Sequence, residues 1–269
     1  MHDATLEFVG TATTLLRLGP FTLLTDPNFL HRGDRAYLGN GLFSKRRTEP
    51  SLQPVDLPRL DAIVLSHLHG DHFDRIARRE LDRTLPILTT PAASRRLRDW
   101  DFTETTAMRP WDSHVLESDG ARLQITSVPG EHAPRPARAL LPPVMGSVLE
   151  LSEGGMPPLR IYVTGDTLYR PWLHEVVDRC GRIDAMVIHL GGTRALGLLV
   201  TMDAKQGAEL VELIRPALTV PIHYDDYTVF RSPLRDFVAT WGLRKLPGTL
   251  RTVHRGETVS LRPDRSRLT

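Results

Sequence analysis

The motif Ser-His-Leu-His-Gly-Asp-His restricts what this chain can fold into more than any other stretch. It follows an apolar run at 62–65, which is typical of a buried strand. His67 and His69 are two positions apart, so in extended chain their imidazoles point the same way and can share one ion. Asp71 and His72 follow a glycine, where the backbone can bend and aim a second pair of ligands at a neighbouring point. Zinc accepts this mixture of imidazole and carboxylate, so the motif predicts a metal site.

A histidine-rich surface turn is the alternative interpretation of the motif. Three further apolar runs argue against it, because each leads to another ligand-type residue. They are 123–128 before His132, 159–165 before Asp166 and 217–222 before His223. Open sheets place their sites at the carboxyl ends of strands, so we expect these residues to meet the motif at one edge.

The order of these residues along the chain resembles the metallo-β-lactamase superfamily, and the resemblance spans essentially the whole sequence. It implies an α/β (α+β) fold, an αββα sandwich of the metallo-β-lactamase type, where periodicity alone gives only mixed α and β. It also implies two divalent metal ions, with zinc as the default and manganese, iron or nickel left open. The implied ligands are His67, His69 and His132 for the first ion and Asp71, His72 and His223 for the second, with Asp166 bridging both.

The implied chemistry is hydrolysis. Two metal ions about 3.5–4 Å apart can share a water and lower its pKa toward 7, which supplies a bridging hydroxide without a serine or cysteine nucleophile. Asp71 has a second expected role, orienting that hydroxide and passing a proton to the leaving group. The sequence thus predicts a dinuclear metal-dependent hydrolase that cleaves an ester, lactone or phosphodiester bond in a small, anionic substrate.

Shorter phrases resemble one subgroup, the ascorbate-6-phosphate lactonase-like and N-acylphosphatidylethanolamine phospholipase D-like hydrolases. They are Thr-Asp-Pro at 25–27, Thr-Gly-Asp-Thr at 164–167, Met-Asp-Ala at 202–204 and Pro-Ile-His-Tyr at 221–224. Asp166 stands where some lactamases carry cysteine, which disfavours antibiotic hydrolysis. His69 stands where flavodiiron relatives carry glutamate, which disfavours reduction of oxygen or nitric oxide.

Two other functions remain alternatives. A nuclease or nucleotide phosphodiesterase would show strong salt dependence and a basic surface stripe. The net charge of +2 and the lack of an inserted domain between His132 and His223 disfavour it, so no nucleic-acid partner is expected. An inactive metal-binding regulatory protein is disfavoured by the complete ligand set.

Composition sets the remaining expectations. A chain of 269 residues that is 41% hydrophobic can bury one large core, and no linker is apparent, so we expect a single hydrolase domain over 1–269. The lone Cys180 excludes an internal disulfide and fits a reducing compartment. Neither a signal peptide nor an apolar run of membrane-spanning length is visible, which predicts a soluble, cytoplasmic protein without a transmembrane segment. Its partner is a small-molecule substrate, and homo-oligomerisation is left open.

Substrate contacts are expected from residues near the ligands. Residues 28–58 form a long irregular segment that we expect to lie over the active-site mouth. Arg46 and Arg47 in this segment, and Arg135 beyond His132, can grip an anion with paired hydrogen bonds. Tyr224 follows the last ligand and either touches substrate or serves the local turn.

Two further polar residues end strands. Asp26 is either an acceptor for a ligand histidine or part of an ordinary Asp-Pro turn. For His189, an ordinary hydrogen-bonded role is favoured over lining the pocket. The patterns place strands at 6–9, 14–18, 21–24, 62–65, 86–89, 115–116, 122–128, 144–151, 159–163, 185–189, 217–222 and 250–253, and helices at 73–82, 92–100, 172–180, 203–213 and 234–241.

Overall fold

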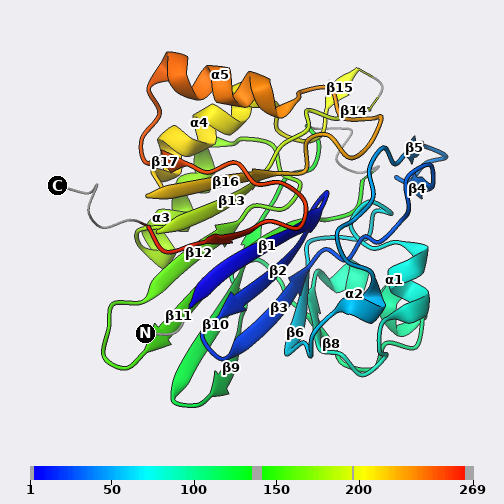
Figure 1. The fold of residues 1–269 in the computed structure, drawn as a ribbon, viewed down its shortest axis with the longest axis horizontal. Coiled ribbons are helices and arrows are strands. Elements are labelled where there is room, and N and C mark those ends of the chain that lie inside the picture. Colours follow the sequence, from blue (N-terminus) through cyan, green and yellow to red (C-terminus); the bar gives the residue numbers. More distant parts are fainter. Residues whose placement is uncertain (1–2, 135–140, 196, 264–269) are drawn as a thin grey trace.

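The computed structural model describes residues 3–134, 141–195 and 197–263, and it is built on two seven-stranded sheets packed face to face (Figure 1). The first sheet has the order β18-β1-β2-β3-β6-β7-β8. Its strands are β1 (Ala4–Gly10), β2 (Thr13–Leu18), β3 (Phe21–Thr25), β6 (Ala62–Leu65), β7 (Ile87–Thr89), β8 (Thr105–Ala107) and β18 (Thr258–Ser260). From β3 to β8 the strands are parallel, so their carboxyl ends share one edge.

The second sheet has the order β17-β16-β13-β12-β11-β10-β9. Its strands are β9 (Ser113–Ser118), β10 (Ala121–Pro129), β11 (Met145–Glu153), β12 (Leu159–Val163), β13 (Ala185–His189), β16 (Leu218–Ile222) and β17 (Thr249–Leu250). β12, β13 and β16 are parallel neighbours. β9 to β12 form an antiparallel meander whose first turn contains Asp119 and Gly120, a residue pair typical of tight hairpins.

Helices cover the outer faces of both sheets (Figure 1). α1 (Arg75–Glu80) and α2 (Pro91–Arg98) pack on the first sheet, where Leu24 and Ile63 meet Ile76 and Leu97. α3 (Glu175–Cys180), α4 (Ala204–Ile214) and α5 (Leu234–Arg244) pack on the second. Between the sheets, residues such as Leu6, Leu16, Ile125, Leu149 and Val187 form one buried cluster. The fold is therefore the αββα sandwich expected from the sequence, and it explains the continuous apolar runs of central strands such as β6 and β13, which are buried on both faces.

Short or polar elements differ from the expectations. The segment 28–58 contains a hairpin of β4 (Arg35–Tyr37) and β5 (Phe43–Lys45), together with the 3-10 turn η1 (Pro54–Asp56). β8, β18 and the small pair β14 (Arg194–Ala195) and β15 (Leu198–Leu199) are additional. The helix expected at 172–180 begins as the 3-10 turn η3 (Pro171–His174), and the last parallel strand lies at 249–250 rather than 250–253. Within the described residues, no helix combines the length and apolar character needed to cross a membrane.

Candidate metal centre

Three histidines converge on one point at the carboxyl edge of the sheets. The Nε2 atom of His67, which is one residue removed from the end of β6, lies 2.9 Å from Nδ1 of His69. The Nε2 atom of His132, beyond β10, lies 3.2 Å from the same Nδ1 atom. All three side chains are buried, and one nitrogen from each lies within 4.8 Å of the others, which is close enough for one metal ion to bind all three. The two sheets thus jointly supply this group.

A second group lies beside the first. It consists of Asp71, His72 and His223, and Nε2 of His223 lies 3.6 Å from Oδ2 of Asp71. Asp166 lies between the groups: its Oδ2 atom is 3.2 Å from Nε2 of His72 and 4.0 Å from Nε2 of His132. The structure therefore brings together all seven side chains that the sequence singles out as ligands.

Local backbone geometry aims two of these residues. Asp166 follows Gly165, whose φ is +62° and where a Cβ would lie 2.5 Å from the Met145 carbonyl oxygen. Only glycine fits such a turn, so β12 can end sharply and present Asp166. His223 itself has a φ of +62°, although it is not glycine. Its backbone N–H donates to the Thr11 carbonyl at 2.9 Å, a bond between the sheets that helps to hold this strained conformation.

The polar atoms of this cluster fit divalent metal ions. His223 Nε2, Asp71 Oδ1 and Asp166 Oδ1 are buried and have no hydrogen-bond partner. Buried polar atoms are normally satisfied, so three unsatisfied ones at one place require a partner of another kind. Imidazole nitrogens and carboxylate oxygens are the donors that zinc and similar divalent ions accept. The residues present therefore fit the metals that the ligand pattern implies.

The charges of the cluster point the same way. Burial, together with the nearby His72 and His69 charges, holds the pKa of His67 well below its usual range. Burial and His132 lower the pKa of His69 to about 3. These histidines are consequently neutral near pH 7, which is the form that binds metal.

The pKa values of His72 and Asp166 move in opposite directions. Burial alone would lower the pKa of His72, but the Asp166, Asp26 and Asp71 carboxylates outweigh it and raise the pKa well above its usual range. Burial alone would raise the pKa of Asp166, but His223 and His72 hold it well below. The negative charge of these buried carboxylates thus favours a positive charge beside them, which a bound divalent cation would provide.

Hydrogen bonds behind the cluster orient its histidines. His132 Nδ1 lies 2.7 Å from the Val200 carbonyl oxygen, and His223 Nδ1 lies 3.1 Å from that of Leu190. His72 Nδ1 lies 3.1 Å from Oδ2 of Asp26, whose Oδ1 accepts from the Ser66 N–H at 2.7 Å. Asp26 is thus an acceptor for His72, a candidate ligand, rather than only a turn residue. Such outer partners fix the ring orientation and tautomer of a ligand histidine.

The structure adds His189 to this surrounding layer. Its Nε2 atom lies 3.6 Å from Oδ2 of Asp26, and its ring stacks at 6.1 Å on that of His72. With Asp26 and His72 it forms a third buried group of ligand-type atoms. From the sequence we expected an ordinary hydrogen-bonded histidine. The signal that locates it is its place at the end of β13, between two strands that each lead to a ligand.

Two of the expected substrate contacts are corrected by the structure. Arg46 is fully buried, and its guanidinium donates to the carbonyl and side-chain oxygens of Asn28 and to the Thr48 carbonyl. The Tyr224 hydroxyl donates to the Val253 carbonyl at 3.1 Å, with the ring buried. Both side chains are therefore committed to internal bonds.

The two other arginines have different outcomes. Arg47 is exposed, and its backbone N–H donates to the Asp226 carbonyl at 2.7 Å. Arg135 lies outside the described residues. The prediction that Arg46 and Arg47 together grip an anion is thus wrong, because Arg46 is buried in the protein interior while Arg47 faces solvent.

The segment 28–58 does contact the metal motif. The Gly70 N–H donates to the Tyr37 carbonyl at 2.8 Å, and a Cβ on Gly39 would lie 3.7 Å from Nε2 of His69. Asp74 anchors the start of the segment, because its Oδ2 atom accepts from the Leu30 N–H at 2.7 Å while its Oδ1 atom caps α1. The β4–β5 hairpin therefore lies against His69.

The fold and the buried ligand groups define a metal-dependent hydrolase of the metallo-β-lactamase type. The model of the beta-lactamase superfamily domain matches residues 22–224, a range that contains all seven ligand candidates. The chain belongs to this superfamily.

Similar proteins agree with this assignment. A metal-dependent hydrolase from Thermoplasma acidophilum is 27% identical over 197 residues, covering 71% of this chain and 77% of the relative. One from Pyrococcus furiosus is 24% identical over 219 residues, covering 80% and 84%. Two solved structures share the fold. A possible metal-dependent hydrolase from Veillonella parvula has a TM-score of 0.80 and 21% sequence identity, and the match covers 97% of this chain and 99% of that one. An isothiocyanate hydrolase from Delia radicum gut bacteria has a TM-score of 0.79 and 18% sequence identity, and the match covers 96% of this chain and 99% of that one.

Proposed function

We propose that the chain is a dinuclear hydrolase that cleaves an ester, lactone or phosphodiester bond in a small molecule. The observation that carries this proposal is the position of Asp166, whose carboxylate lies within 4.0 Å of both His72 and His132. A carboxylate between two complete ligand groups is suited to bridging two ions. Zinc is the first candidate, and manganese, iron and nickel are alternatives. We treat residues 1–269 as one hydrolase domain, because the two sheets supply ligands jointly.

Bound divalent ions at such a site supply Lewis acidity and an activated water. The chain's own residues do the rest. His67, His69 and His132 offer one set of neutral nitrogens, and Asp26 orients His72 toward the second set. Asp71 is buried, and its Oδ1 atom has no hydrogen-bond partner. We assign it the role of orienting the attacking water and passing its proton to the leaving group.

An anionic substrate is not part of this proposal. Arg46 and Tyr224 are committed to internal bonds, so Arg47 is the exposed one among the described residues that were expected to contact substrate. Arg135 lies outside the described residues, and its contact with an anion stays a prediction. The proposed subgroup is the ascorbate-6-phosphate lactonase-like and phospholipase D-like one, supported by the Thr-Asp-Pro phrase that brings Asp26 to His72. The name of the isothiocyanate hydrolase adds isothiocyanates to the candidate substrates. Water attacks the central carbon of an isothiocyanate much as it attacks a carbonyl carbon.

The test is a turnover screen of the purified, metal-loaded protein. It covers lactones, carboxylic esters, isothiocyanates, phosphodiesters, phosphomonoesters and nucleic acid, with elemental analysis of each preparation. We expect two metal equivalents per chain and turnover of at least one small-molecule class. Only trace metal after reloading would contradict the site. Full metal without turnover would favour the inactive regulatory protein, and salt-sensitive cleavage of nucleic acid would favour the nuclease.

A further inference from the structure

A cavity of about 160 Å³ lies beside His132, on the side of the first ligand group. Its walls come from the ends of β7, β8 and β10 and from the approach to β11. His132 therefore belongs both to the first ligand group and to the wall of this cavity. A group bound here would lie next to the proposed reaction centre.

Among the residues that the structure describes, the lining of this cavity is mostly apolar and includes no acidic, lysine or arginine side chain. Much of the cavity wall consists of the side chains of Met108, Leu141, Val144 and Met145, and prolines form much of the rest. Methionine is flexible and polarisable, so it adapts to apolar groups of different shapes.

The polar side chains among the lining residues are already engaged. Thr90 Oγ1 accepts from the Ala93 N–H as the cap of α2, and Ser127 Oγ donates to Sδ of Met145. His132 Nδ1 faces the Val200 carbonyl oxygen. A phosphate or carboxylate placed here would lose its hydration without gaining a charged partner from the described lining side chains, which is unfavourable.

We propose that this cavity binds an uncharged apolar group of the substrate, a short alkyl chain or a single aromatic ring, while the bond to be cleaved faces the metal ligands. The inference rests on the proposed hydrolase function. Its size limit follows from the volume, because a cavity of about 150 Å³ lined by apolar residues accepts benzene. The substrate class is therefore a neutral ester, lactone or related electrophile with one small apolar substituent.

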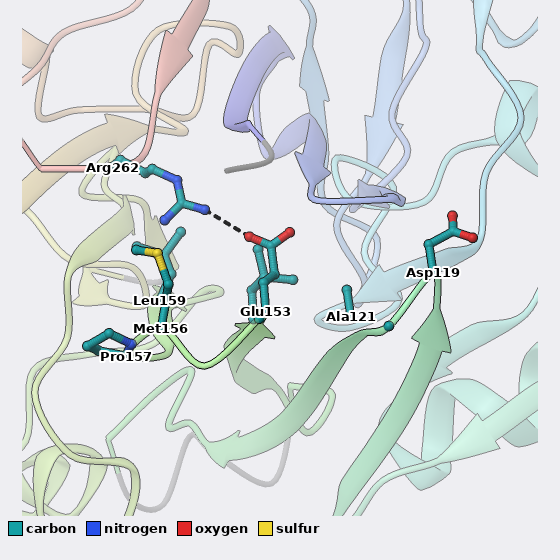
Figure 2. A pocket seen from close by; sticks show the side chains of 10 residues that line it. Asp119, Ala121, Glu153, Met156, Pro157, Leu159 and Arg262 are labelled. Atoms are coloured by element: carbon teal, nitrogen blue, oxygen red, sulfur yellow. Dashed lines mark hydrogen bonds and ion pairs between the residues drawn. The ribbon is translucent and has the colours of Figure 1, made fainter.

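A larger cavity elsewhere does not fit this role. This distal cavity measures about 470 Å³ and lies at the turns of the β9–β10 and β11–β12 hairpins (Figure 2). Its walls carry Asp119 and the ion pair of Glu153 with Arg262, at 3.1 Å, and none of the seven ligand candidates lines it. The cavity beside His132 is smaller, but it shares His132 with the first ligand group, whereas the larger one shares no residue with either group.

Direct binding tests the inference without any turnover. Zinc-loaded protein carrying ¹³C-methyl methionine is titrated with benzyl alcohol, a neutral probe with one ring. We expect saturable shifts of the Met108 and Met145 methyl signals, assigned through M108L and M145L variants, and none at Met156 in the distal cavity. Equal shifts at all three, or no saturation at Met108 and Met145, would overturn the inference.

Variants of a half-buried wall residue provide the second arm. Leu141→Trp fills the cavity from its rim and should weaken benzyl alcohol binding at least tenfold. The matched control is Met156→Ala, which trims an exposed apolar side chain of the distal cavity and should leave binding unchanged. Circular dichroism establishes that both variants are folded. Unaltered binding in folded Leu141→Trp would contradict the assignment.

Turnover separates failure of this inference from failure of the proposed function. The comparison is between 4-nitrophenyl butyrate and the 4-nitrophenyl hemiester of succinate, which has similar length and a terminal charge. We expect at least a tenfold higher kcat/KM for the butyrate and a smaller preference in Leu141→Trp. Hydrolysis of both at equal rates would overturn the inference alone. Saturable probe binding with no hydrolysis of any substrate would support the pocket and overturn the hydrolase.

Discussion

The Nδ1 atom of His72 lies 3.1 Å from Oδ2 of Asp26, while its Nε2 atom lies 3.2 Å from Oδ2 of Asp166. The ring is thus held between two buried carboxylates from different sheets. An Nδ1–H donated to Asp26 leaves the Nε2 lone pair directed at the second ligand group. Asp26 has a φ of +38°, and its other oxygen accepts from the Ser66 N–H, so β3 and the motif are joined at this point.

The first prediction concerns Asp26→Ala. Loss of this partner of His72 should lower the affinity for the second metal about 10–100-fold, with the first metal retained. Chelator competition followed by elemental analysis measures the two steps. The control is Asp184→Ala, which removes a carboxylate that accepts from the Arg160 N–H away from the ligand cluster. Equal loss of both metals in Asp26→Ala would show that Asp26 supports the fold generally.

The second prediction concerns Asp71→Asn. The amide preserves the shape of the side chain but cannot carry a proton, so turnover should fall about 10²–10⁴-fold. The fold and the first metal should persist, because His67, His69 and His132 are unchanged. The kcat on the substrate found by screening is the measurement. A near-normal kcat would remove Asp71 from the proton-transfer role.

The third prediction concerns Asp166→Ala. In the proposed two-metal site, Asp166 lies nearer to the second group than to the first, at 3.2 Å from His72 and 4.0 Å from His132. The first ion would keep its three histidines, whereas the second would lose this nearby carboxylate. The second metal should therefore be lost at lower chelator concentration than the first. Stepwise metal release, followed during chelator titration, distinguishes this from uniform weakening, which would argue against a bridging carboxylate.

The sequence predicts much of this site because each ligand follows an apolar run. Asp166 lies 34 positions after His132, and His223 lies 57 positions after Asp166, yet strands that end at one edge bring them together. The sandwich was predicted by the family resemblance, with the long apolar strands consistent with it.

Other features depend on tertiary partners that no local pattern reveals. β18 is a short, polar strand whose pairing with β1 joins opposite ends of the chain. Arg46 and Arg47 are adjacent and chemically identical, but one is buried against Asn28 and the other is exposed. Burial of an arginine is decided by the acceptors that surround it, and those come from distant residues.

The fourth prediction concerns Gly70→Ala. A Cβ at this position would lie 2.7 Å from the Tyr37 nitrogen and 2.8 Å from its oxygen, both of them backbone atoms. The β4–β5 hairpin must then move away from the motif, which should cost about 1–3 kcal/mol of unfolding free energy. Since Gly39 of this hairpin lies close to His69, we also expect kcat/KM to fall.

The matched control for this change is Gly242→Ala in α5. A Cβ there meets no atom within 4 Å, so alanine should stabilise the helix by about 0.5–1 kcal/mol. Urea denaturation measures both variants. If Gly70→Ala were as stable and active as the parent, close packing of the hairpin on the motif would not matter for function.

The last prediction separates the two neighbouring arginines. Arg46→Ala leaves the Asn28 side-chain oxygen without this donor and removes a guanidinium that lies 5.7 Å from the Tyr227 ring centre. Loss of charged hydrogen bonds and packing in a buried site should lower the unfolding free energy by about 2–4 kcal/mol. Arg47→Ala changes an exposed side chain and should stay within about 0.5 kcal/mol. Urea denaturation of the metal-loaded proteins is the measurement, with KM for a neutral and a charged ester as the second readout. An Arg46→Ala variant of parental stability that raised KM only for the charged ester would restore Arg46 as a substrate contact, because an arginine needed for the fold cannot be removed without cost.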